Sequence, residues 1–207
     1  MAGLNLDTTQ LVALAAALGW ASGLRLYAVV FLTGLAGALG WVSLPAGLQV
    51  LQHPVVLGAS GLMLAVEFFA DKVPGLDTLW DTVHTVIRIP AGAALAAGVF
   101  GGDQATWAFV AALAGGTLAA TSHAAKTTTR AAVNTSPEPF SNIGLSLLGD
   151  AAVPAMLWLA WEHPAWFFAA LAAALLLSVV LIVVLLKFLR AVIARARRWF
   201  GAPPVEA

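Results

Sequence analysis

The sequence predicts an all-α integral membrane protein. Of its 207 residues, 61% are hydrophobic and only 10% are charged, whereas roughly a quarter of the residues in a soluble domain are charged. The apolar runs are rich in Ala, Leu and Gly without a period of two, and an open sheet edge cannot face lipid. The chain is too short to add a large soluble domain, so residues 1–207 are expected to form a single polytopic membrane domain.

Composition excludes several other classes of protein. Ten basic and ten acidic residues give zero net charge, whereas nucleic-acid binding needs a surplus of Lys and Arg. The absence of cysteine excludes disulfides, thiol catalysis and thiolate metal sites. The first residues lack a basic region, so a signal peptide is not expected, and Asp7 with Gln10 instead matches a helix start. No cofactor and no catalytic residue are expected.

Six segments have the apolar length of about 20 residues that crosses the hydrocarbon of a bilayer. They are 8–39, 54–71, 78–100, 104–122, 141–161 and 164–190. An alternative with seven spans divides the long first segment at Gly19 to Gly23.

The basic residues predict the orientation of these six spans. The loops 40–53, 101–103 and 162–163 hold no Lys or Arg, and the basic residues other than Arg25 lie on or toward the opposite side. Because loops rich in Lys and Arg stay in the cytoplasm, both termini are expected on the cytoplasmic side of a cell inner membrane. The tail 187–207 is basic and amphipathic, which favours contact with anionic lipid.

The first and fourth segments share a pattern. A cluster of Gly, Ser and Thr precedes Arg25 in one and Lys126 in the other. If residues 1–100 and 101–190 are related halves, three spans in each make them inverted repeats, as in small transporters. Chance resemblance between two Ala-rich helices is an equally good interpretation.

Ionisable residues form three groups that can meet at one site. The third segment carries four on one helix face, at i, i+4, i+7 and i+11: Asp77, Asp81, His84 and Arg88. The second segment ends in Glu67, Asp71 and Lys72, followed by a Pro-Gly turn that reverses the chain. The fourth carries a basic stripe at i, i+3 and i+7: His123, Lys126 and Arg130.

Two further charges, Arg25 and Asp150, lie inside apolar segments. A lone ionised group in hydrocarbon costs several kcal/mol, so each is expected to face the protein interior or a wet cavity and to find a partner there. With Glu138, the candidate interior groups are five bases and six acids. A charged lining for transport and a cytoplasmic cap of interlocking loop charges are the two interpretations, and the placement of charge inside apolar segments favours the lining.

The connection between the fourth and fifth segments is interrupted by proline. Pro137 and Pro139 remove backbone donors and extend the chain, Glu138 lies between them, and Asn134 and Asn142 can cap the neighbouring helix ends. This loop is either a gate that contacts the transported species or an ordinary turn.

Three blocks carry a resemblance to a known family: GWASGLRLY, EFFADKVPGLDTLWDTVHTVIRIPAG and SHAAKTTTRAAVNTSPEPFSN. Together they resemble the bacterial inner-membrane family named domain of unknown function 4126, and the likeness covers nearly the whole chain. The resemblance implies a membrane protein and no specific activity.

The first functional hypothesis is a small transporter or channel for an ion or small polar solute, with proton coupling through His84 or His123. The second is a protein that binds lipid head groups at the cytoplasmic face, either a flippase or a membrane enzyme. In that case Arg88, Lys126 and Arg130 would clamp a phosphate, and Asp77, Asp81 and His84 would hold a divalent metal. A third is a non-catalytic membrane scaffold. The expected partners are the lipid bilayer, the transported species and further copies of the chain.

Overall fold

The computed structural model describes residues 6–73, 75–135 and 140–199, and within these ranges all regular structure is helical. The elements are α1 (Thr8–Ala38), the 3₁₀ helix η1 (Ala46–Gln52), α2 (Pro54–Ala70), α3 (Leu76–Gly98), η2 (Gly102–Gln104), α4 (Ala105–Val133), α5 (Phe140–Glu162) and α6 (Pro164–Trp199). Four helices are long and apolar enough to cross a membrane, and the bent pair of η1 and α2 raises this number to five. The chain is therefore a multi-pass helical membrane protein, while a count of six spans stays a prediction.

Helix α1 consists of two arms that join at Arg25. The φ of −146° and ψ of 76° at this residue lie outside the helical region. The first arm starts at the expected cap, where Asp7 and Gln10 bond reciprocally to each other's backbone N–H, and Gln10 also reaches the Trp161 carbonyl at the end of α5. The second arm runs back along η1 and α2, so that Gly34 lies against Leu51 of η1 and the ring of Phe31 lies against Gly61 of α2.

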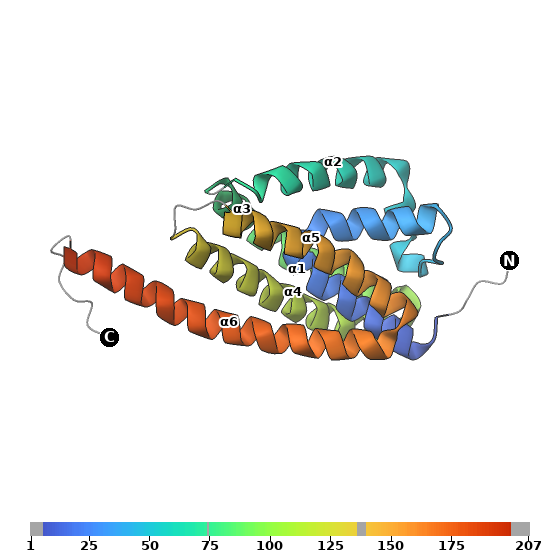
Figure 1. Cartoon of the computed structure of the whole chain (residues 1–207). Coiled ribbons are helices and arrows are strands. Elements are labelled where there is room, and N and C mark those ends of the chain that lie inside the picture. Colours follow the sequence, from blue (N-terminus) through green and yellow to red (C-terminus); the bar gives the residue numbers. More distant parts are fainter. Residues whose placement is uncertain (1–5, 74, 136–139, 200–207) are drawn as a thin grey trace.

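The break changes the predicted arrangement. Both ends of α1 lie at the same end of the molecule, on the right in Figure 1, and α6 runs from there to the opposite end. Thr8 and Trp199 therefore lie at opposite ends, whereas six simple spans would put both termini on one side. The division of the first segment in the seven-span alternative is closer to the structure, although the break falls at Arg25 rather than at Gly19 to Gly23.

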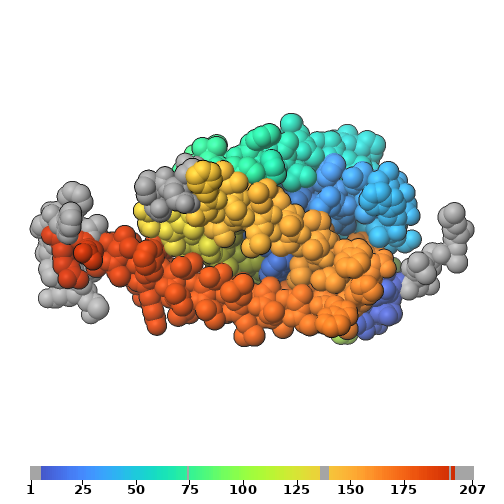
Figure 2. Space-filling model, viewed as in Figure 1, coloured from blue at the N-terminus to red at the C-terminus, as the bar shows by residue number. Residues whose placement is uncertain are grey.

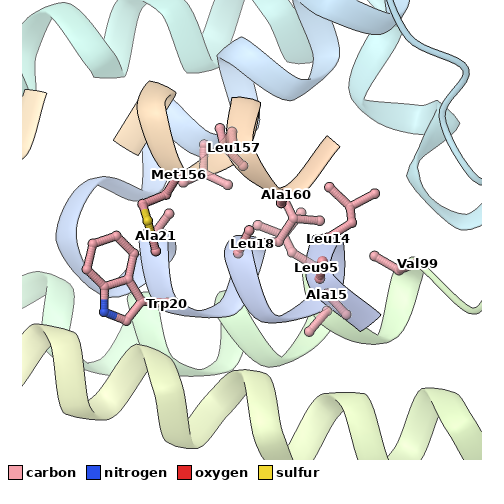
Figure 3. Packing of buried hydrophobic residues seen from close by; sticks show 14 of the residues in the cluster. Leu14, Ala15, Leu18, Trp20, Ala21, Leu95, Val99, Met156, Leu157 and Ala160 are labelled. Atoms are coloured by element: carbon pink, nitrogen blue, oxygen red, sulfur yellow. The ribbon is translucent and has the colours of Figure 1, made fainter. Parts of the chain in front are cut away.

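The first arm of α1 is at the centre of the bundle. Figure 3 shows Leu14 and Leu18 of this arm beside Leu95 of α3 and Leu157 of α5. Glycine allows a close approach to α4, because a Cβ on Gly19 would lie 2.5 Å from the Cα of Gly115. Such small residues let membrane helices pack through their backbones, so the first arm of α1 lies directly against α4.

Helix α6 lies at the edge of the bundle. Its first half packs on α4 and α5, and its last turns extend past the other helices (Figure 1). Lys187 and Arg190 are exposed on this extension, which agrees with a basic tail at the membrane surface.

Candidate functional site: a buried charged cluster

Ten ionisable side chains meet around the bend of α1. We call them the charged cluster: Arg25, Glu67, Asp71, Lys72, Asp77, Asp81, Arg88, Lys126, Arg130 and Asp150. Five are bases and five are acids, so the cluster is neutral when all are ionised. Lys72 and Asp150 are the most exposed, with about a fifth of each side chain accessible, and the others are buried or nearly so.

Asp71 is the centre of the cluster. It is the C-cap of α2, where its backbone N–H bonds to the Glu67 carbonyl. Its carboxylate pairs with Arg25 of α1, with Lys126 Nζ at 3.1 Å and with Arg130 Nη1 at 2.8 Å. One carboxylate thus ties the bend of α1 and the end of α2 to α4.

Arg88 forms the deepest part of the cluster, on α3. One of its nitrogens, Nη2, lies 2.6 Å from Glu67 Oε1, and the other, Nη1, lies 2.7 Å from Asp81 Oδ1. Asp81 also pairs with Lys126 at 3.0 Å and with Arg130 at 3.5 Å. Glu67 has no base other than Arg88 among its ion-pair partners in the described part of the chain, so the charge of each stabilises the other.

Arg25 closes the opposite side of the cluster. Its Nη2 donates to the Ser146 carbonyl at 3.0 Å and to the Ser146 hydroxyl at 2.8 Å, and pairs with Asp150 at 2.9 Å. Asp150 also contacts Lys72 at 3.4 Å. Arg25 and Asp150, which both lie inside apolar segments, therefore form an ion pair with each other.

Helix α4 supplies donors for carbonyls near the bend. The Ser122 hydroxyl donates to the Trp20 carbonyl at 2.6 Å, and Lys126 Nζ donates to the Leu24 carbonyl at 3.1 Å. A break in a helix leaves carbonyls without their intrahelical partners, and irregular backbone at membrane depth is tolerated only where protein or water satisfies it. The side chains of α4 thus make the bend possible.

The two histidines lie at the edge of the cluster. His84 Nδ1 is 2.8 Å from the Trp80 carbonyl, so this nitrogen carries the hydrogen, and Nε2 accepts from the Tyr27 hydroxyl at 3.1 Å. His123 Nε2 lies 2.7 Å from the Thr85 hydroxyl. His84 shares a helix face with Asp81, as its spacing predicts, but its hydrogen bonds go to Tyr27 and Trp80.

Asp77 anchors the two described ends of the proline-interrupted loop. Asn134 Nδ2 donates to its carboxylate at 3.2 Å and Asn142 Nδ2 at 2.9 Å. Pro137, Glu138 and Pro139 lie outside the described residues. The anchoring contacts connect the loop to the cluster, and its role as a gate stays a prediction.

A metal site at Asp77, Asp81 and His84 does not form. Asp77 bonds to the two asparagines, Asp81 faces three bases, and His84 bonds away from both. Among the described residues, no group of three or more His, Asp or Glu side chains is arranged to hold a metal ion. A divalent metal at these three residues therefore has no support in the described part of the chain.

A cavity of about 290 Å³ lies beside the cluster, between α1, α4, α5 and α6. Figure 2 shows the molecule hollowed between α5 and α6, with atoms of α4 and α1 at the bottom of the hollow. Arg25, Lys126 and Arg130 line the cavity from one side, and leucines and alanines of α5 and α6 line it from the other.

Sequence reasoning did not identify several polar groups of the site. These are the side chains of Tyr27, Thr85, Ser122 and Ser146, which bond to the charged residues, to the histidines or to the bend. The Trp20 carbonyl, which accepts from Ser122, was also not identified. A signal existed for Tyr27, which is the only tyrosine of the chain and lies two residues after Arg25.

Comparison with known protein families identifies the family of the chain. The family model for the Domain of unknown function (DUF4126) matches residues 12–205, so the chain belongs to that family. No curated protein and no solved structure matches the chain.

Proposed function

We propose that this family member is a small transporter or channel of the bacterial inner membrane, which moves an ion or small polar solute through the charged cluster. The observation that supports the proposal is the broken helix α1, whose bend at Arg25 carries a buried guanidinium into a neutral ion-pair network. Discontinuous helices whose unwound backbone meets charged side chains are the usual construction of transport sites in membranes.

The energetics favour a task for the cluster over a purely structural role. Taking ions out of water costs several kcal/mol each, and well-packed apolar residues can replace a buried ion pair at little or no cost in stability. A passive helix bundle would gain little from placing Arg88, Glu67 and Asp81 in its interior, all at most 2% exposed. Transport gives these charges a function, since a permeating ion can exchange partners with them.

The same geometry leads to a topology. The segments 39–53, 99–104 and 162–163, at the end of the molecule where α1 starts, contain no Lys or Arg, while α6 carries its basic residues at the other end. The positive-inside rule then places the carboxyl-terminal end of α6 in the cytoplasm and Thr8 on the outer side. This topology makes α1 a re-entrant hairpin rather than one of the candidate spans, since each arm alone is shorter than the about 20 residues that cross a bilayer.

Flux through proteoliposomes tests the proposal. We expect purified protein to raise the flux of at least one probe among H⁺, K⁺, Na⁺ and Cl⁻, measured with ion-sensitive dyes inside the vesicles. Asp150→Asn should lower that flux, because Asp150 pairs with Arg25 and Lys72 at the more exposed edge of the cluster.

Lys187→Met provides the matched control, since Lys187 is exposed on α6 away from the cluster. Flux equal to that of empty vesicles for every probe at acidic, neutral and alkaline pH would exclude ion transport. Equal flux in the Asp150→Asn variant and the parent would instead show that any transport does not pass through this cluster.

A further inference from the structure

The cavity between α1, α4, α5 and α6 has an unusual charge distribution. The charged residues among its described lining are all bases: Arg25, Lys126 and Arg130. Their main carboxylate partners, Asp71 and Asp81, reach them from α2 and α3 and do not line the cavity. The rest of the lining is mostly apolar, and each of the three bases is already paired with a carboxylate outside the lining. A group that enters the cavity therefore meets bases and no acid, which favours an anion over a cation.

One hydrogen-bond donor of the lining lacks a partner. Trp20 is buried, with 6% of its surface exposed, and its Nε1 has no hydrogen-bond acceptor among the described residues. A buried donor without an acceptor is unfavourable, because it has lost its hydrogen bond to water and gained none in the protein. An oxygen-rich group in the cavity beside Trp20 would supply the missing acceptor.

The rim of the cavity is apolar and opens toward the lipid-facing surface. Leu148 of α5 and Leu177 of α6 both line the cavity and have more than half of their side chains exposed, and Figure 2 shows the hollow between these two helices. A hydrated ion would have to shed water against this rim, at a high cost in free energy. An amphiphile can enter sideways from the bilayer and leave its tail in the lipid.

We infer that this cavity binds a membrane lipid with an anionic phosphate head group. The head group meets Arg25, Lys126, Arg130 and the Trp20 N–H, and the first methylenes contact the leucines of α5 and α6. The volume of about 290 Å³ is at the lower limit of small-molecule pockets, which hold about 300–1,000 Å³. It therefore fits a head group and the start of a chain while the rest of the chain stays in the membrane.

Quenching of tryptophan emission tests the site. Brominated phosphatidic acid is titrated into the full chain in detergent, with brominated phosphatidylcholine as the comparison lipid. We expect saturable quenching at a lower concentration of the anionic lipid, and loss of part of that quenching in Trp20→Phe. Ala152→Phe fills the cavity and should weaken the binding at least about tenfold, the factor that corresponds to the loss of one charge-assisted contact.

Ala155→Phe is the matched control, because Ala155 lies on the same helix, is exposed and does not line the cavity. Equal quenching by both lipids, or an unchanged affinity in Ala152→Phe, would overturn the proposal. Competition by inorganic phosphate at the same concentration as the lipid would assign the site to a free anion instead.

If Ala152→Phe does not fold, the parent is compared with Trp20→Phe. Equal quenching of these two proteins by the anionic lipid would then overturn the proposal. The titration measures no flux, so its result is independent of whether the protein transports ions.

Discussion

The pair formed by Glu67 and Arg88 allows a quantitative test of the buried cluster. Both side chains are inaccessible to solvent, and Arg88 Nη2 lies 2.6 Å from Glu67 Oε1. Arg88→Met leaves the Glu67 carboxylate without its base, whereas Asp81 keeps Lys126 and Arg130. Removing one partner of a buried pair costs about 3–5 kcal/mol, because the remaining charge stays buried without compensation.

The double variant Glu67→Gln with Arg88→Met removes both charges and keeps the cluster neutral. We expect it to recover at least about 2 kcal/mol relative to Arg88→Met, since coupled neighbours show interaction energies of this size. The free energy of unfolding is measured by titration with sodium dodecyl sulfate in mixed micelles, and exposed Lys187→Met should stay within about 0.5 kcal/mol of the parent. Equal stability of Arg88→Met and the parent would refute a buried ion pair between Glu67 and Arg88.

Three further predictions concern the packing, the bend and the topology. Gly19→Ala should destabilise the protein by about 1–3 kcal/mol in the same titration, because its Cβ would meet the Gly115 backbone. Gly58→Ala has open space around it and should not destabilise the protein. Equal losses of stability in the two variants would contradict the close α1–α4 contact. Ser122→Ala removes the donor to the Trp20 carbonyl and should lower the stability by about 1 kcal/mol. Thr117→Ala should lower it less, because the Thr117 hydroxyl bonds to its own helix on the exposed face. A larger loss of stability for Thr117→Ala would rule out this role of Ser122. Because the chain has no cysteine, single introduced cysteines report on which side of the membrane a residue lies. Thr9→Cys and Asp103→Cys should react with a membrane-impermeant maleimide added outside, and Thr135→Cys should react only after the membrane is permeabilised. If Thr9→Cys and Thr135→Cys both react only after permeabilisation, the result would support a cytoplasmic amino-terminal end.

The sequence was most informative where spacing alone determines placement. Asp77, Asp81, His84 and Arg88 lie on one helix face because the helical period requires it, and α2, α3, α5 and α6 begin within two residues of the predicted segments. The start of α1 was equally readable, since the reciprocal bonds of Asp7 and Gln10 are local.

The bend of α1 could not be located in this way, because it depends on distant partners. The stretch around Arg25 is compatible with a helix, and the break is stabilised by donors on α4 and by carboxylates on α2 and α5. The same limit applies to Gly19, whose importance comes from the Gly115 backbone opposite it. The cavity was unpredictable for a similar reason, since four helices contribute to its wall.

The bend and the cluster depend on each other, and this dependence bears on function. Straightening α1 would remove Arg25 from Asp71 and Asp150 together and would deprive Lys126 of the Leu24 carbonyl. Neutralising Asp71 would remove the carboxylate that Arg25, Lys126 and Arg130 share. Arg25 would then depend on Asp150, and Lys126 and Arg130 on Asp81, so we expect the bend to be held less firmly. A partly separated cluster would contain unpaired buried charges, so the bend and the cluster are expected to change together. If an anion competes for one of these bases, as the proposed lipid site implies, we expect α1 to shift as a whole, which is the response that a gated membrane site would need.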